Sequence, residues 1–507
     1  MSSLDFKAYN PFPLGHDHKL TCDMGQLVPI LCKEIIPGDI FRCKAHVIMR
    51  LIPQLAPFMH QVNLYVHYFY VPSRLIKDNW EKFITRGFSG NEAVPWSYIK
   101  APAEGFKKYS LADYFGLSIN VPNVVVDAGP FRAYAMIINE WYINENLQKY
   151  IEFDKGDGLD TKTPTDCKYR NWMNDYFTGC LPWAQRGDPV YLPLGTDAPL
   201  VVGDQVDTVS LAKTPEQLTK GTELAAVSYT PGGSFVADAL GAATGGSTSG
   251  VKIVADLSKA TAATVNSVRV AFQVQKWMER NARGGVRYVE YLLSHFGEKS
   301  SDARLQRPEY LGGGKSRLFT SEVLQTSSTD STSPQGNMSG YTMSMQNTMS
   351  FTRKFEEFGY VIGLLSVMPK TQYQQGIERM WTRKTALDYY DPLFAHLGQQ
   401  AVLNKEIYAQ GTEDDDKVFG FTDRYKEQRT SYSYVSGDFR DDLDYWTMTR
   451  KFENLPQLNS DFVQAKDVTK RVFTVTNAKP CIVDVGFDIQ ALRKLPKHGT
   501  PGLIDHG

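Results

Sequence analysis

One short stretch of the chain has the residue types of a phosphate-binding loop. Residues 314–316 read Gly-Lys-Ser, the end of the P-loop pattern, in which a lysine and a hydroxyl contact nucleotide phosphates and Mg²⁺. The leading glycine of that pattern would fall at position 309, which is Glu309. A serine-nucleophile elbow fails as well, because Thr248 occupies the serine position between Gly246 and Gly250. The sequence therefore predicts neither nucleotide hydrolysis nor serine catalysis, and we expect no enzyme.

Histidine and acidic side chains could bind a metal ion, but their spacing matches no metal-binding motif. No H-E-x-x-H or Cys/His pattern accompanies the candidate histidines, which are His16, His18, His60 and His67. The acidic runs Glu413 to Asp416 and Asp438 to Asp444 lack the glycine and the alternating oxygen ligands of an EF-hand loop. We interpret these runs as solvated faces, with weak calcium binding as the alternative. We predict no metal site and no cofactor.

Arginines cluster on both sides of the glycine pair at positions 284 and 285. The planar guanidinium fork binds phosphate and carboxylate equally well, so the cluster suits either nucleic acid or an interface between subunits. We favour subunit interfaces, because the net charge is only −1 and aromatic stacking partners are not interleaved with the arginines. The predicted interface residues are Arg280, Arg283, Arg287, Arg304 and Arg307.

The composition is that of a folded protein with a large core. Of 507 residues, 42% are hydrophobic and 22% are charged, and the 12% that are aromatic suit sheet faces and protein interfaces. The six cysteines form no C-x-x-C pair and are too few for a disulfide scaffold, so we expect folding in a reducing cytoplasm. The first residues do not resemble a signal peptide, and the apolar runs are too short to span a bilayer. We therefore expect no membrane insertion.

Alternating apolar and polar residues predict strands near both ends of the chain. Phe41 to Arg50 and Cys481 to Ile489 both alternate with a period of two, so each should bury one face. Val62 to Val71 is a run of aromatic and β-branched residues that ends at Pro72. Strands at both ends are what a Greek-key sandwich requires when its first and last strands pair.

Helical periodicity appears in three other segments. Tyr134, Ile137, Ile138 and Trp141 form one apolar stripe, and the stripe from Val270 to Met278 should end at the glycine pair 284–285. A shorter helix is expected from Asp78 to Arg86. The helices do not alternate regularly with strands, so we interpret them as loop insertions around an antiparallel sheet.

Two tracts differ in composition from the rest. Residues 200–256 are rich in Thr, Gly, Ala and Ser, and we expect a surface insertion there, with a disordered loop as the alternative. Residues Thr326 to Ser350 are too polar for a core, and we expect a mobile loop, with a segment that orders only when neighbouring subunits cover it as the alternative.

Several longer strings resemble one protein family. They are EIIPGD (34–39), VPSRLIKDNWEKF (71–83), NARGGVRY (281–288), RLQRPEYLGG (304–313), EVLQTSSTDSTSPQGNMSG (322–340) and FGYVIGLLSVMPKTQYQQGIERMW (358–381). Together they resemble the major capsid proteins of microviruses, in the gokushovirus branch, over most of the chain. The chain departs from the family pattern at Lys77, Asn281, Val286 and Gln399. These departures affect details of contacts and not the class.

The resemblance implies a structural protein. It implies a mainly β fold, one antiparallel eight-stranded jelly-roll domain over residues 1–507 with long, partly helical insertions, and a protrusion at the three-fold axes built by 200–256. It also implies pentamers that close into a T=1 shell around circular single-stranded DNA, a virion assembled in the bacterial host cytoplasm. The implied partners are a small basic DNA-binding protein, an internal scaffolding protein, a minor or pilot protein, and a host cell-surface receptor.

The net charge of the chain indicates which protein neutralises the genome. A net charge of −1 cannot neutralise a genome, so a separate basic protein should do so. The best candidates for a DNA-facing patch are Arg493, Lys494 and Lys497, with a solvated tail as the alternative. Two other classes of protein are alternatives. One is a carbohydrate-binding or adhesive β-sandwich, which would typically carry a secretion signal. The other is a hydrolase on a β scaffold, but no residue spacing in the chain indicates a catalytic pocket.

Overall fold

The computed structural model describes residues 9–190, 200–202, 253–255, 265–324 and 338–497. The chain divides into two compact units. One comprises residues 1–187 and 278–507, and the other comprises residues 188–277.

The larger sheet contains strands from both ends of the chain. Its order is β1-β18-β4-β12-β11, with β2 also paired to β18, and every pairing is antiparallel. The strands are β1 (Asn10–Pro13), β2 (His16–Cys22), β4 (Ile40–Leu51), β11 (Phe319–Leu324), β12 (Met338–Lys354) and β18 (Cys481–Arg493). The predicted pairing of the first and last strands is confirmed.

The smaller sheet has the antiparallel order β10-β5-β13-β3. Its strands are β3 (Val28–Ile35), β5 (Val62–Pro72), β10 (Glu309–Arg317) and β13 (Gly359–Pro369). Without β1 and β11, each sheet has four strands. Along the chain, β2, β3, β4 and β5 belong alternately to the larger and the smaller sheet, and β10, β12, β13 and β18 alternate again, beginning with the smaller sheet. This is the order of an eight-stranded jelly roll, and the predicted fold class is confirmed.

The two sheets bury one core between them. Along β4 the apolar side chains of Phe41, Cys43, Ala45, Val47 and Met49 point into this core, while the residues between them are exposed. Strand β5 is buried along nearly its whole length, because its second face packs on a further apolar cluster. The smaller sheet is therefore covered on both faces, and the larger sheet on one.

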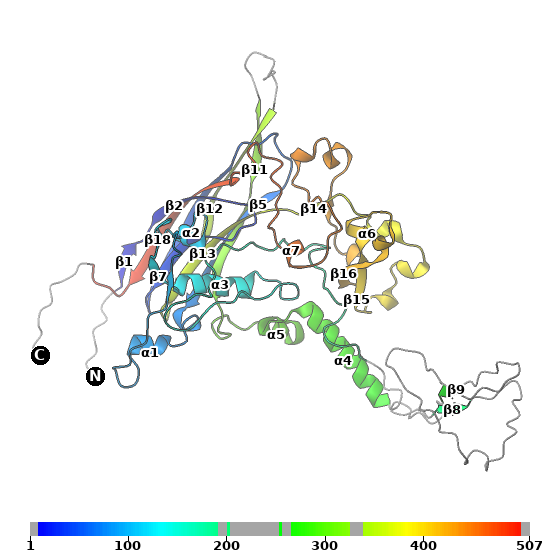
Figure 1. Cartoon of the computed structure of the whole chain (residues 1–507), viewed down its shortest axis with the longest axis horizontal. Coiled ribbons are helices and arrows are strands. Elements are labelled where there is room, and N and C mark those ends of the chain that lie inside the picture. Colours follow the sequence, from blue (N-terminus) through cyan, green and yellow to red (C-terminus); the bar gives the residue numbers. More distant parts are fainter. Residues whose placement is uncertain (1–8, 191–199, 203–252, 256–264, 325–337, 498–507) are drawn as a thin grey trace, which may run out of the picture. The chain divides into compact units, whose positions relative to one another are not determined.

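Helix α3 (Gly129–Trp141) covers the outer face of the smaller sheet (Figure 1). The predicted apolar stripe is its core-facing side. The short helices α1 (Trp80–Thr85) and α2 (Leu111–Tyr114), the turn η1 (Ser73–Leu75), and the strand pair β6 (Tyr98–Lys100) and β7 (Val125–Asp127) lie in the same long insertion. Helix α1 is shorter than predicted, because Arg86 adopts a left-handed conformation with φ of 60° and ends it.

A second insertion lies between β13 and β18 and shares a small core with Tyr176, Phe177 and Cys180 from the segment that follows α3. It contains the parallel pair β14 (Gln372–Tyr373) and β17 (Ser433–Tyr434), the antiparallel pair β15 (Gln399–Leu403) and β16 (Val418–Asp423), and the helices α6 (Asn404–Ile407) and α7 (Ser460–Val463). Its 3-10 turns are η4 (Arg379–Thr382), η5 (Ala386–Asp388), η6 (Pro392–Phe394), η7 (Glu413–Asp416), η8 (Lys426–Gln428), η9 (Gly437–Arg440) and η10 (Asp444–Trp446).

The loop predicted for Thr326 to Ser350 is wrong over its second half. Residues 325–337 lie outside the described part of the chain, but from Met338 onward the tract forms β12, which pairs with β4. Thr342 and Ser344 are buried there because each has a hydrogen-bonding partner. Gln54 Nε2 donates to Thr342 Oγ1 at 2.6 Å, and the hydroxyls of Ser316 and Ser344 are 3.0 Å apart.

The stripe from Val270 to Met278 lies in α4 (Val265–Gly284), which ends at the predicted glycine pair, and α5 (Tyr288–Phe296) follows. The ends of the predicted surface insertion form β8 (Leu200–Val202) and β9 (Ile253–Ala255), which pair antiparallel, while residues 203–252 lie outside the described part. None of the helices in the described residues combines the length and the apolar character needed to cross a bilayer.

Candidate functional site: an arginine and carboxylate cluster

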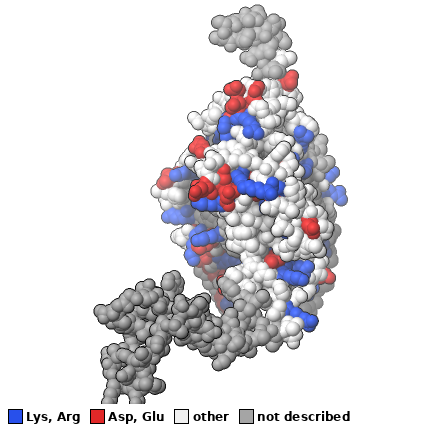
Figure 2. Space-filling model, turned by 90° about the vertical axis from the view of Figure 1, so that its right-hand side faces the viewer, with Lys and Arg blue, Asp and Glu red and all other residues white. Residues whose placement is uncertain are grey.

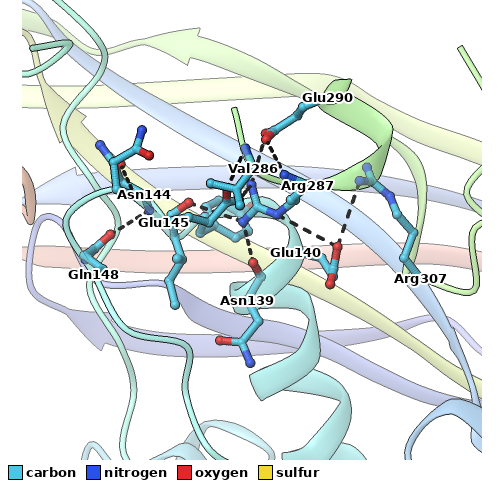
Figure 3. Close-up of polar contacts among 12 residues, drawn as sticks. Asn139, Glu140, Asn144, Glu145, Gln148, Val286, Arg287, Glu290 and Arg307 are labelled. Carbon is cyan, nitrogen blue, oxygen red and sulfur yellow. Dashed lines mark hydrogen bonds and ion pairs between the residues drawn. The ribbon is translucent and has the colours of Figure 1, made fainter. Parts of the chain in front are cut away.

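Two of the predicted interface arginines meet where the turn between α4 and α5 approaches the end of α3 (Figure 3). Gly285 makes this turn with φ of 97°, a conformation that glycine adopts without strain. The turn places Arg287 at the N-cap of α5, where its backbone N–H donates to the Glu290 carboxylate at 3.1 Å. A local signal in the sequence, a glycine pair followed by arginine, thus positions the central side chain of the site.

The Arg287 guanidinium contacts three carboxylates and two backbone carbonyls. It pairs with Glu290 at 3.2 Å, with Glu140 at 3.9 Å and with Glu145. It also donates hydrogen bonds to the carbonyls of Asn139 and Ile143. These carbonyls lie at the C-terminal end of α3, where the helix dipole favours a positive charge. Arg287 therefore fixes the α4–α5 turn to the end of α3.

Arg307 extends the cluster on its other side. Its guanidinium pairs with Asp302 at 2.9 Å, lies 4.0 Å from Glu140, and stacks 4.3 Å from the ring centre of Trp141. The residue is only 9% exposed, so these contacts are shielded from solvent. Because Glu140 contacts both arginines, the two form one network that ties three segments of the chain together.

The electrostatics of the cluster suit packing and not proton transfer. Burial raises the pKa of the Glu145 carboxyl above its ordinary value, and the charge of Arg287 opposes that rise. A guanidinium does not lose its proton in proteins, so neither arginine can serve as a base. The arginines neutralise the carboxylates and donate hydrogen bonds to the carbonyls. Such contacts hold segments of the chain together.

A cavity of about 720 Å³ opens beside the cluster, lined in part by His67, Tyr142, Arg170 and Arg287. His67 Nδ1 lies 2.7 Å from the Tyr142 hydroxyl. Burial, helped by the Arg170 charge, lowers the pKa of His67 to about 4, and burial raises the pKa of Tyr142. A neutral histidine beside a tyrosine that holds its proton tightly makes a poor catalytic pair, so we interpret both as packing residues.

The other predicted interface arginines lie outside the cluster. Arg283 is half exposed and 4.0 Å from Asp423. Arg280 and Arg304 are exposed, and neither has an ion pair within the described residues. The structure thus brings Arg287 and Arg307 together and leaves the rest at the surface. The role of all five at subunit interfaces stays a prediction.

The predicted DNA-facing residues also differ from one another. Arg493 pairs with Asp39 at 3.1 Å, donates to the Glu34 carbonyl at 3.0 Å and lies over the Phe41 ring. Lys494 lies 5.5 Å from the centre of the Tyr9 ring, and Lys497 is exposed. On the face shown in Figure 2, positive and negative side chains are interspersed without a basic stripe. Contact of these residues with DNA stays a prediction.

Neither the histidines nor the Gly-Lys-Ser tail forms a ligand site. Within the described residues, no group of His, Cys, Asp or Glu is arranged to hold a metal ion. Residues 314–316 lie in strand β10, and an extended strand cannot wrap around a phosphate as a P-loop does.

Among the described residues, the most deeply buried ion pair was missed by sequence reasoning. Arg132 of α3 and Asp160 are 2.8 Å apart and both side chains are fully buried. Burial alone would raise the pKa of Asp160, but hydrogen bonds from Thr163 and the pairing with Arg132 outweigh it and lower the pKa. The only signal available was a charged residue among the apolar ones of the α3 stripe.

The fold is a jelly-roll sandwich, and the charges of the cluster serve packing within the chain. A family model described as "Capsid protein (F protein)" matches residues 8–503. The chain is 38% identical over 503 residues to "Capsid protein VP1" of Bdellovibrio phage phiMH2K, covering 96% of this chain and 94% of that protein. It is 36% identical to "Capsid protein VP1" of Chlamydia phage 1 (97% and 95% covered) and 34% identical to "Capsid protein VP1" of Spiroplasma virus 4 (95% and 93% covered).

The chain belongs to the family of phage capsid proteins described as F protein. The resemblance to microvirus capsid proteins, read from the short strings above, is confirmed. A capsid protein is part of the virion and assembles with copies of itself into a shell, so this chain is a structural component of a phage particle and not an enzyme.

Proposed function

We propose that this chain is the major capsid protein of a T=1 icosahedral shell that is built from pentamers and encloses a circular single-stranded DNA genome. The family match over residues 8–503 carries the proposal. Subunits of one kind close into a shell only when head-to-tail contacts complete rings, and the long insertions between the jelly-roll strands supply surface for such contacts. Subunits assemble in the cytoplasm of the bacterial host.

The genome is neutralised mainly by a partner. The chain has 55 Lys and Arg against 56 Asp and Glu, so its own charge cannot offset the phosphates that it encloses. A small basic DNA-binding protein fills that role, with Arg493, Lys494 and Lys497 contributing a minor inner patch. An internal scaffolding protein and a minor or pilot protein complete the assembly.

Residues 1–507 act as one jelly-roll capsid domain, from which residues 200–256 protrude at the three-fold axes and contact a receptor on the host surface. The antiparallel pairing of β8 with β9 supports an excursion that leaves and returns at one place. The Thr, Gly, Ala and Ser composition of the segment between them is typical of exposed chain.

Expression in bacteria together with the scaffolding partner tests this function. We expect material that sediments as closed shells and shows five-fold neighbours by negative-stain electron microscopy. Recovery of monomers alone, under every salt and pH condition that keeps the protein folded, would contradict the proposal.

A further inference from the structure

Helix α5 is amphipathic, but its apolar side points outward and its polar side faces the rest of the chain. With 100° between successive residues, all but one of its apolar and aromatic side chains fall on an arc of roughly 140°. The exception is Tyr291, and the five on the arc are Tyr288, Val289, Leu292, Leu293 and Phe296. No residue of this helix is buried, and Tyr288, Leu293 and Phe296 are 66%, 55% and 65% exposed. A surface helix ordinarily turns such an arc toward the core. We call this arc the α5 surface.

The polar side of α5 faces the rest of its own chain. Glu290 bonds to Arg287 in the cluster described above, and the ring of His295 lies 2.8 Å from the Asn281 side chain. Ser294 lies against Gly284, close enough that a β-carbon there would collide with it. These contacts fix the orientation of the helix and leave Tyr288, Leu293 and Phe296 exposed, while Val289 and Leu292 are partly covered. The Arg287 cluster therefore fixes α5 in an orientation in which the α5 surface points away from the rest of the chain.

A second exposed apolar surface lies on the turns η4 to η6. Its side chains are more than half exposed and include Trp381 at 74%, Leu387 at 64% and Leu393 at 84%, together with Tyr389, Tyr390 and Leu397. We call them the η4–η6 surface. In Figure 1 this segment, drawn in yellow next to α6, is well separated from α5, although both belong to the same compact unit.

Polar groups hold the η4–η6 surface from beneath. Arg379 donates to the Ala401 carbonyl at 2.7 Å and pairs with the buried Glu406 at 3.4 Å. Asp388 caps η5 by accepting from the Thr385 backbone. A charged side chain thus points inward while Trp381 and the leucines point outward. A fixed turn that displays apolar side chains loses little conformational entropy when a partner covers them.

We propose that the α5 surface of one copy packs against the η4–η6 surface of a neighbouring copy. A head-to-tail contact that closes a ring needs two different surfaces on each subunit, and the chain offers two separate ones. Tryptophan and tyrosine are among the residues that most often dominate binding at interface centres, because each can bury a large apolar area when a partner covers it. The inference rests on the proposed shell-forming function and assigns one of its contacts.

Lysine substitutions test whether both surfaces are needed. Leu293→Lys and Leu387→Lys each place a charge where the contact would bury it, so we expect loss of sedimenting shells with an unchanged melting temperature. Leu159→Lys is the matched control, because Leu159 is 47% exposed and lies outside both surfaces, and it should assemble like the unmodified chain. Normal shells from both test variants would overturn the inference.

Chemical crosslinking tests the pairing itself. Leu293→Cys and Leu387→Cys are prepared separately, co-assembled and treated with a short bismaleimide. We expect crosslinked dimers from the mixture and only background from either variant alone. The natural thiols should react slowly, because burial raises the pKa of Cys32 and of Cys43 to about 12 and also raises the pKa of Cys167 and of Cys180. Shells that form without the mixed crosslink would refute the pairing and leave the capsid function intact, whereas failure of the unmodified chain to form shells would refute the function.

Discussion

At the scale of single residues, Arg287 shows how a charge can define the position of an element. Its guanidinium is 12% exposed and balances the carboxylate of Glu145, which is 7% exposed. Loss of the arginine would leave that carboxylate uncompensated in a shielded site and two carbonyls at the end of α3 without their donor. The cost of an unpaired buried charge exceeds the net gain from the pair itself.

We therefore expect Arg287→Gln to lower the free energy of unfolding by about 3 kcal/mol. Arg304→Gln is the matched control, since Arg304 is exposed and should change stability by less than about 0.5 kcal/mol. Urea denaturation of both variants, followed by fluorescence, measures the difference. Equal losses for the two substitutions would show that the cluster contributes nothing beyond surface charge.

One buried histidine, His60, and one partly buried histidine, His67, should make the protein sensitive to acid. The Met448 backbone N–H lies 3.3 Å from His60 Nδ1, and His60 Nε2 lies 2.7 Å from the Lys370 carbonyl, so the ring is held as the neutral tautomer that accepts at Nδ1. Burial lowers the pKa of His60 to about 4, and burial also lowers the pKa of His67 to about 4. An unfolded chain takes up these protons near pH 6.5, before the folded chain can.

Stability from these groups is thus fully present above about pH 6.5 and is lost as the pH falls toward 4. The loss from His60 should be of the order of 3 kcal/mol across this window. His60→Gln should flatten the pH dependence of the unfolding free energy, while His396→Gln, at an exposed position, should leave it unchanged. An identical slope in His60→Gln and the unmodified chain would refute the assignment.

The site could be predicted in part at this scale. The cluster of arginines around the glycine pair is visible in the sequence because its members are close along the chain. The partners of Arg287 could not be read in the same way, since Glu140 and Glu145 are supplied by the far end of α3 and the residues that follow it. For the same reason the pairing of Arg132 with Asp160, which lie 28 residues apart, could not be read from the sequence.

At the scale of elements, periodicity predicted those segments whose burial is one-sided. β4 and β18 alternate because one face of the larger sheet is exposed. The stripe on α3 identified that helix too, although the helix is buried at every position from Phe131 to Asn139. β12 was predicted as a loop because its buried hydroxyls look polar in the sequence. Hydrogen bonds with Gln54 and with Ser316 make that burial favourable, and these partners are distant along the chain.

The turn between α4 and α5 gives a prediction for one glycine. A β-carbon at Gly285 would collide with a carboxylate oxygen of Glu290 and would also be strained at φ of 97°. Gly285→Ala should therefore lower the unfolding free energy by more than about 1 kcal/mol and loosen α5. Thermal unfolding gives the stability, and hydrogen exchange of the α5 amides gives the local effect.

Gly38→Ala is the control for this substitution. Gly38 has a similar φ of 92°, but a β-carbon added there would meet nothing within 4 Å. It therefore reports the backbone strain alone, and the difference between the two variants reports the collision with Glu290. Equal destabilisation would mean that Glu290 moves away freely and that the capping contact is weak.

At the scale of the whole molecule, the sandwich and the segment between β8 and β9 should be separable. Because β8 and β9 pair antiparallel, the ends of residues 203–252 are held side by side, and a short glycine and serine linker can join them. Replacing residues 203–252 by such a linker should keep the melting temperature within a few degrees and reduce attachment to host cells. Calorimetry and a particle-binding assay measure the two effects, and unchanged attachment would reject the receptor role.

The place of β18 in the larger sheet also governs when a subunit becomes complete. This strand follows every other strand of the sandwich along the chain, yet it lies between β2 and β4 and pairs with both. A ribosome must therefore translate past residue 493 before the sheet can close, and growing chains on one messenger cannot yet present finished subunits to each other. Synthesis itself delays association until β18 of each copy has been translated, which limits premature aggregation on a crowded polysome.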